Sequence, residues 1–466
     1  MNTTQETRPA ANDLNPKAAV PILLFSFVFC LIVDNGFKTM TMPIAEGLGI
    51  SDNTASLQAS LAGVVIGIGA VFYAALADSI SIRKLMLVGI ALIGVGSLLG
   101  YFGSSSWALV LSGRLIQTCG LAAAETLYVI YVTKHLEEKD QKTYLGFSTA
   151  AFQLGLLVGA LTSGYIATYI SWTAMFLVPL VLLFAAPVIH KMVPEDEAVE
   201  GHLDVFGLLL IAVFAASLTM YMQAFNPLWL IPTVVGVALF AWHVMNHKGA
   251  VVAPEFFKNG RYVWALVLVL IIYSTQLGFI FLLPYAGSEL HGLAPDKAAL
   301  LMVPGYICAV LAGVFSGAIG KVLSSRTTIF IALGMIILAL VLSAVLIEVS
   351  VIALIISIVL FATGFALMYA PLVNTALQNI TAAKSGIAIG FYNLTINIAI
   401  PLGIAYTAKL QDIGASWFGG MSSATTGQGQ MFATVLWTLA LIAIVGTVIY
   451  FFADRALLSR ERQAAV

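Results

Sequence analysis

The chain has 466 residues, of which 60% are hydrophobic and 9% are Asp, Glu, Lys or Arg, whereas a soluble protein carries about 25% charged residues. This composition excludes a water-soluble globular protein and is typical of an all-α polytopic membrane protein. The formal net charge of -1 leaves no positive field for nucleic acid. The three cysteines lie far apart without metal-ligand spacing, so we expect neither a metal nor a cofactor.

Fourteen apolar segments are each long enough, at about 20 residues, to cross a bilayer as a helix. In chain order the predicted spans cover residues 18–43, 56–78, 85–103, 107–133, 145–168, 171–190, 205–223, 227–246, 263–284, 298–320, 328–347, 351–377, 386–408 and 429–453. The polar stretch before them lacks the features of a cleavable signal peptide, so we expect the first span to stay in the mature protein.

These spans form two halves of six helices with an inserted pair between them. The predicted organisation is a tail (1–19), a first bundle (20–190), an acidic linker (191–204), two inserted helices (205–246), a loop (247–262), a second bundle (263–453) and a second tail (454–466). An internal similarity supports the duplication, because AALADSISIRK (Ala74 to Lys84) resembles GAIGKVLSSRT (Gly317 to Thr327), with Arg83 displaced onto Arg326. A chance likeness between two helix ends is the alternative.

The distribution of basic residues predicts the orientation of the chain. An even number of spans puts both termini on one side, and short cytoplasmic loops are enriched in Lys and Arg. Seventeen of these residues fall on the terminal side, and only Lys297 and Lys409 fall opposite. We therefore expect both termini to be cytoplasmic, in a multi-pass protein of the plasma or inner membrane.

Four charged residues lie inside predicted spans, where a charge costs about 2.5–3.5 kcal/mol on insertion scales unless it faces a cavity or a partner. Asp34 and Lys38 share one face of the first span, and Arg114 and Glu125 lie in the fourth. Asp34 and Arg114 lie at similar depths in the membrane, so we expect them to pair. No basic residue lies at the depth of Glu125. Burial without a partner favours a protonated carboxyl near neutral pH, so Asp34, Arg114 and Glu125 are candidates for proton coupling.

These charges also have ordinary interpretations. Asp34, Lys38 and Arg114 could form a structural knot between helices, Glu125 could meet a hydroxyl or water, and Lys38 could extend to the membrane surface. Uncharged polar side chains and one tyrosine give weaker candidates for substrate contacts, since hydrogen bonding between helices or packing explains them as well. The predicted substrate-binding residues are Lys38, Gln117, Tyr128, Gln153, Gln276, Asn393 and Asn397.

Sequence signatures of soluble enzymes are missing. The chain has no HExxH, GxSxG or GxxxxGK[ST] motif, so we expect neither an enzyme nor an ATP-driven pump.

Four segments resemble the signature motifs of the major facilitator superfamily, specifically of its fourteen-span drug:proton antiporters. They are DNGFKTMTMP (from Asp34), AALADSISIRK (from Ala74), RLIQTCG (from Arg114) and GLLVGALTSG (from Gly155). The resemblance covers essentially the whole chain and implies two six-helix bundles that move against each other around a substrate site.

The same resemblance implies roles for individual residues. Asp78, Arg83 and Lys84 match the loop that latches the two bundles and are predicted gating residues, and Arg114 matches the arginine linked to proton coupling. Lys38 is unusual for the family and suggests a substrate bearing a carboxylate, or a zwitterion, rather than a simple lipophilic cation.

The sequence therefore predicts a proton-coupled efflux transporter of small organic molecules that works by alternating access. One alternative is an exporter of an anionic or zwitterionic metabolite, such as a siderophore or an amino-acid derivative. An alternative of another class is a non-transporting membrane sensor or scaffold. The expected partners are a small-molecule substrate, protons and the lipid bilayer, and we expect a monomer.

Overall fold

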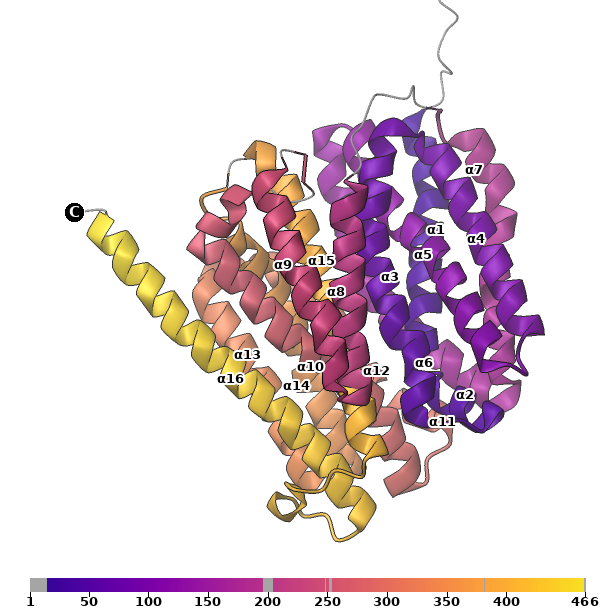
Figure 1. Cartoon of the computed structure of the whole chain (residues 1–466), viewed down its shortest axis with the longest axis vertical. Coiled ribbons are helices and arrows are strands. Elements are labelled where there is room, and N and C mark those ends of the chain that lie inside the picture. Colours follow the sequence, from indigo (N-terminus) through magenta and orange to yellow (C-terminus); the bar gives the residue numbers. More distant parts are fainter. Residues whose placement is uncertain (1–14, 196–203, 248, 251–253, 381, 465–466) are drawn as a thin grey trace, which may run out of the picture.

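The computed structural model describes residues 15–195, 204–247, 249–250, 254–380 and 382–464, and these residues contain helices and no strand. The first half, indigo to magenta in Figure 1, stands beside the second half, rose to yellow. The first half consists of α1 (Pro16–Lys38), α2 (Thr41–Leu48), α3 (Asp52–Ser79), α4 (Ile82–Phe102), α5 (Trp107–His135), α6 (Glu138–Tyr169), η1 (Trp172–Phe176), η2 (Val178–Ala185) and α7 (Ala186–Met192).

The second half follows two inserted helices. The inserted segment consists of α8 (Val205–Ala224), η3 (Pro227–Trp229), α9 (Leu230–Asn246) and η4 (Pro254–Lys258). The second half consists of α10 (Gly260–His291), α11 (Pro295–Leu300), α12 (Val303–Val322), α13 (Ser325–Leu346), α14 (Val351–Ala376), α15 (Ala382–Asp412), η5 (Gly419–Met421) and α16 (Gly427–Ala464). Helix α8 packs against both α3 and α15, so the inserted pair covers the seam between the halves.

Two predicted spans are broken by proline. The first was expected to run unbroken over 18–43, but α1 ends at Lys38 and α2 begins at Thr41. Pro43 has no N–H with which to bond the carbonyl of Thr39, four residues earlier, and its ring crowds that carbonyl. Pro304 acts in the same way where α11 ends and α12 begins.

Twelve of the described helical segments are long and apolar enough to cross a membrane, which confirms a polytopic helical membrane protein. Helices α6 and α15 stand where the fifth and thirteenth spans were predicted but are not among these twelve. Among the residues of α6 whose side chains are described, Leu154–Tyr169 forms a shorter apolar helix. The count of fourteen spans therefore stays a prediction, as do the domain boundaries.

The suggested duplication has a counterpart in the contacts of two arginines. The Nε atom of Arg83 donates to the carbonyl of Val193, 2.6 Å away, just after α7. The Nε atom of Arg326, the residue aligned with it, donates to Asp454 of α16, 2.5 Å away. Each arginine thus contacts the sixth helix of its own half or the residues just after it, as two copies of one bundle would require.

The two ends of the structure are marked by the linker and by a contact between the halves. The end at which α7 stops and α8 begins lies at the top of Figure 1. At the opposite end the two halves touch, because the Tyr169 hydroxyl donates to the Asp296 carboxylate (3.1 Å) and the Asp296 N–H donates to the Thr168 hydroxyl (3.1 Å).

Candidate functional site

A buried ion-pair network joins α1 to α5. The Asp34 carboxylate accepts from Arg114 Nη2 at 2.6 Å through one oxygen and meets Lys38 Nζ at 2.5 Å through the other. Arg114 has no exposed surface and Asp34 is 2% exposed, so both charges depend on each other for stabilisation. The predicted Asp34–Arg114 pair is confirmed, and Lys38 turns toward Asp34 rather than toward the membrane surface.

The network continues from α5 into α4. Arg114 Nη1 donates to Gln117 at 3.1 Å, and Gln117 donates to the Ser97 hydroxyl at 3.0 Å. Glycine makes this crossing possible, since a Cβ atom on Gly96 would lie 2.5 Å from the carbonyl oxygen of Gly113. Gln117 therefore orients the arginine that holds Asp34.

Glu125 lies on the same helix without a direct contact to these bases. One of its carboxyl oxygens is buried and has no hydrogen-bond partner among the described residues. No ion pair joins it to Lys38 or Arg114 in the part of the chain that the structure describes, although their charges act on it through space. An ionised oxygen in this position is poorly compensated.

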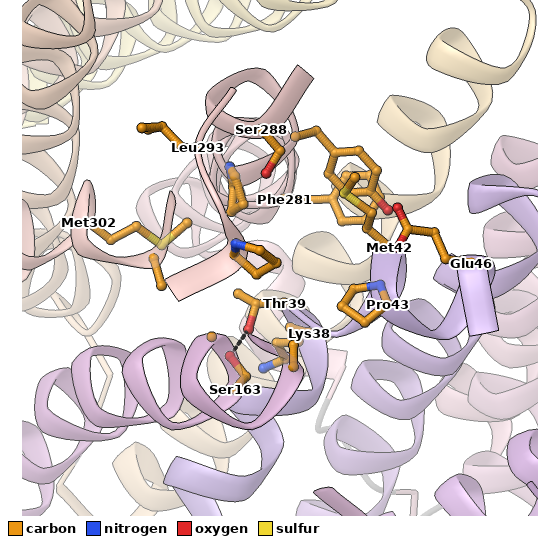
Figure 2. Close-up of a pocket in the computed structure, with 16 residues that line it drawn as sticks. Lys38, Thr39, Met42, Pro43, Glu46, Ser163, Phe281, Ser288, Leu293 and Met302 are labelled. Atoms are coloured by element: carbon orange, nitrogen blue, oxygen red, sulfur yellow. Dashed lines mark hydrogen bonds between the residues drawn. The ribbon is translucent and has the colours of Figure 1, made fainter. Parts of the chain in front are cut away.

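A cavity of about 220 Å³ opens beside this network at the seam between the halves. Lys38 belongs to both, because its side chain pairs with Asp34 and also lines the cavity. In Figure 2, Lys38, Thr39 and Ser163 form one wall, with Ser288 across from them. The lining residues are Lys38, Thr39, Met42, Pro43, Glu46, Ser163, Gly164, Ala167, Phe281, Pro284, Tyr285, Ser288, Leu293, Pro295, Ala299 and Met302.

Among the predicted substrate-binding residues whose side chains the structure describes, only Lys38 lines this cavity. The Tyr128 hydroxyl donates to the carbonyl of Tyr144 at 2.8 Å, which is a contact between helices. The side chain of Gln153 lies outside the described residues, and Gln276 is half-buried.

The two predicted asparagines lie on α15. Asn393 accepts from the Tyr369 hydroxyl at 3.3 Å, and the side chain of Asn397 donates to the backbone carbonyl of Asn393 at 3.1 Å. Asn397 also faces α3, where a Cβ atom on Gly67 would lie 2.7 Å from its own Cβ. These residues pack the seam between the halves and lie apart from the cavity lining.

Sequence reasoning missed three residues of the site. Ser97 orients Gln117, and Glu46 and Tyr285 line the cavity. Glu46 fell just beyond the predicted end of the first span, and Tyr285 just beyond the ninth. A polar residue close to a span end carries little signal in a hydropathy pattern, and only the helix break at Thr39 turns Glu46 toward the seam.

The model of the family described as "Major Facilitator Superfamily" matches residues 23–404. The chain belongs to this superfamily. Membership indicates a membrane transporter rather than an enzyme.

Relatives with similar sequences are named alike. A protein of Yersinia pestis (strain Pestoides F), named "Putative multidrug resistance protein MdtD", is 26% identical over 299 residues, which cover 61% of this chain and 63% of that protein. A protein of the same name from Yersinia pseudotuberculosis serotype O:1b (strain IP 31758) gives the same values. The match therefore spans less than two thirds of the length of these relatives.

Solved structures with this fold cover nearly the whole chain. A POT family transporter in complex with 5-aminolevulinic acid has a TM-score of 0.67 at 17% identity, covering 93% of this chain and 96% of that one. An auto-inhibited POT family peptide transporter has a TM-score of 0.70 at 13% identity, covering 94% and 96%. At these identities the likeness shows the fold alone.

Two of the three predicted gating residues, Arg83 and Lys84, contact the start of the linker. Lys84 pairs with Glu195 at 2.7 Å, and Arg83 lies 3.4 Å from the same carboxylate. A hydrogen bond from Lys84 and its charge hold the pKa of Glu195 below its usual value. The Asp78 side chain lies outside the described residues. The described contacts of Arg83 and Lys84 join the loop to its own half and linker, whereas the family resemblance suggested a latch between bundles.

The segment that resembles the antiporter motif of the superfamily packs on α1. A Cβ atom on Gly159 would lie 2.7 Å from the carbonyl oxygen of Ile32 and 2.9 Å from the amide nitrogen of Gly36. The Thr39 and Ser163 hydroxyls lie 2.5 Å apart across the same interface. Glycine therefore permits the close approach that places Thr39 and Ser163 on one cavity wall.

Gly159→Val is expected to lower the free energy of unfolding by about 1–3 kcal/mol, because the new side chain overlaps the α1 backbone. Denaturant titration of the purified protein measures the change. Gly313→Val is the matched control, since a Cβ atom on Gly313 has no neighbour within 4 Å. Equal losses in both variants would contradict a tight α1–α6 contact.

Proposed function

We propose that the protein is a proton-coupled exporter of small organic molecules that works by alternating access, with both termini in the cytoplasm. The name of the Yersinia relatives, which refers to multidrug resistance, supports export. The position of the cavity between the two halves supports alternating access, since a site at a seam opens to either side when the halves rock.

The observation that carries the proposal is the double contact of Lys38. Its ammonium group pairs with Asp34 and also lines the cavity. Cargo that attracts this ammonium weakens its hold on Asp34, and a protonated Asp34 releases Lys38 toward the cavity. Proton binding at Asp34 therefore favours a carboxylate at Lys38 and opposes a cationic cargo, which the released ammonium repels, and this linkage is reciprocal. The opposed case exchanges a proton for cargo, as export driven by an inward proton gradient requires.

Glu125 supplies a second protonatable group on the same helix as Arg114. Its buried oxygen has no hydrogen-bond partner among the described residues, so protonation removes an uncompensated charge. With Asp34 ionised, the set of Asp34, Lys38, Arg114 and Glu125 is neutral when Glu125 is ionised and carries one positive charge when it is protonated. A proton on Glu125 therefore changes the field around Lys38.

Transport by purified protein in liposomes with an imposed pH gradient tests the proposal. We expect at least one of ethidium, 4-(aminomethyl)benzoate and 4-methylbenzoate to move against its gradient, and an ionophore that collapses the pH gradient to stop it. Movement that persists after the pH gradient collapses would contradict proton coupling.

A second candidate changes the cargo to an anionic or zwitterionic metabolite, and the presence of Lys38 in the cavity lining favours it. Lys38→Met is expected to weaken binding of 4-methylbenzoate about tenfold, as loss of a charged hydrogen bond does, and to strengthen benzylamine binding, because the ammonium group that repels a cation is gone. Isothermal titration calorimetry on the purified protein measures both affinities. Lys409→Met is the control, because Lys409 pairs with Asp412 outside the cavity. Equal weakening of both ligands by Lys38→Met would count against this cargo class.

A further inference from the structure

Three polar groups of the cavity have bonding capacity left over. They are the Lys38 ammonium, the Glu46 carboxylate and the Tyr285 hydroxyl, all of which line the cavity. An ammonium group has three donors, and Lys38 uses two of them, toward Asp34 at 2.5 Å and toward Asn35 at 3.2 Å. One donor therefore remains for a carboxylate in the cavity.

Glu46 provides an opposite charge in the same cavity. Its side chain is exposed and makes no hydrogen bond or ion pair with any described residue. Asp52, at the start of α3, interacts electrostatically with Glu46, Glu289 and Asp412. Their combined field at this side of the cavity repels a carboxylate and attracts an ammonium group.

Tyr285 gives an independent indication of a ligand. The residue is 5% exposed, and its hydroxyl oxygen is buried without a hydrogen-bond partner among the described residues. A buried hydroxyl without a partner is unfavourable. Because Tyr285 lines the cavity, a polar atom of a bound molecule can satisfy this hydroxyl.

The rest of the lining is mainly apolar. Met42 and Phe281 face the cavity, and Met302 lies on the side opposite Glu46 in Figure 2. Thioether and aromatic side chains of this kind favour an apolar or aromatic body between the polar contacts.

We propose that this cavity binds a zwitterion with an apolar body. The carboxylate of the zwitterion contacts Lys38, and its ammonium group contacts Glu46. The zwitterion also forms a hydrogen bond with the Tyr285 hydroxyl. The inference rests on the proposed transport function and names its substrate class. Such a site differs from one for simple cations, because Lys38 repels a molecule that has only an ammonium group. It also differs from one for simple anions, because Glu46 repels a molecule that has only a carboxylate.

Three probes built on one ring test the proposal. 4-(Aminomethyl)benzoate carries both charges, 4-methylbenzoate only the carboxylate and benzylamine only the ammonium group. Calorimetry on the purified wild-type protein, without a pH gradient, is expected to give an affinity for the zwitterion about tenfold or more above either relative, since each added charged contact contributes on this scale.

Two variants with matched controls assign the contacts. Glu46→Gln is expected to remove the advantage of the zwitterion over 4-methylbenzoate, whereas Asp412→Asn, which changes the same field outside the cavity lining, keeps it. Tyr285→Phe is expected to weaken zwitterion binding about fivefold, the usual effect of one lost hydrogen bond. Tyr392→Phe is its control, because Tyr392 does not line the cavity. Tyr392 is also buried, at 1% exposed, and its hydroxyl likewise has no hydrogen-bond partner among the described residues.

Benzylamine binding as tightly as the zwitterion would overturn the inference, as would a Glu46→Gln variant that keeps the zwitterion preference. Failure of the wild-type protein to bind any of the three probes at millimolar concentration would also overturn it. These outcomes are separate from the proposed function, because binding is measured without a gradient. Selective binding without proton-driven transport would contradict the coupling and leave the zwitterion site in place.

Discussion

Asp34→Asn is expected to abolish pH-gradient-driven transport and to lower the free energy of unfolding by about 3–5 kcal/mol, as loss of one partner from a buried ion pair does. The variant leaves Arg114, which has no exposed surface, without its counter-charge. Lys38 loses the same partner, so two positive charges remain in the site. Transport in liposomes and denaturant titration measure the two effects separately.

A second substitution distinguishes the two effects of Asp34→Asn. In the double variant Asp34→Asn/Arg114→Gln no buried guanidinium remains unpaired, so we expect most of the lost stability to return. Transport should stay absent, because the carboxyl that exchanges the proton is still missing. Transport driven by the pH gradient in the single variant or in the double variant would show that Asp34 does not carry the proton.

Glu125→Gln is expected to abolish proton-driven transport with little loss of stability. Glutamine has nearly the same shape as glutamate. The buried carboxyl oxygen of Glu125 has no hydrogen-bond partner among the described residues, so the substitution breaks no hydrogen bond there. Exchange of cargo across liposomes without a pH gradient should continue, because Glu125 does not line the cavity. The comparison of driven transport with exchange therefore separates coupling from binding.

Glu125→Asp is the control for this substitution, since it keeps a carboxyl at the same position on α5. We expect it to retain part of the driven transport. Full driven transport by Glu125→Gln would remove this residue from the proton path, and loss of exchange together with driven transport would indicate a structural role instead.

The depths of the charged residues in the predicted spans were enough to predict the Asp34–Arg114 ion pair. Asp34 and Arg114 lie at similar depth, and a buried carboxylate and guanidinium must meet, so their contact could be predicted without a structure. The spacing of Lys38 from Asp34 allowed the second contact but also allowed extension toward the membrane surface. Only the packing of α1 against α6, with α10 lining the same cavity, places Lys38 at a cavity wall.

The cavity itself could not be predicted. It depends on the break between α1 and α2, which turns Glu46 toward the seam, and on contacts between halves far apart in sequence. Hydropathy reports how apolar a segment is and says little about which face meets which neighbour. Gln117 and Tyr128 illustrate the limit, because both are polar and buried but bond to other helices rather than face the cavity.

Infrared difference spectroscopy of the purified protein between about pH 5 and about pH 9 tests most directly whether a buried carboxyl exchanges protons. We expect a protonated carboxyl band that disappears as the pH rises and that is missing from the Glu125→Gln spectrum. Identical difference spectra for the wild-type and Glu125→Gln proteins would contradict this expectation.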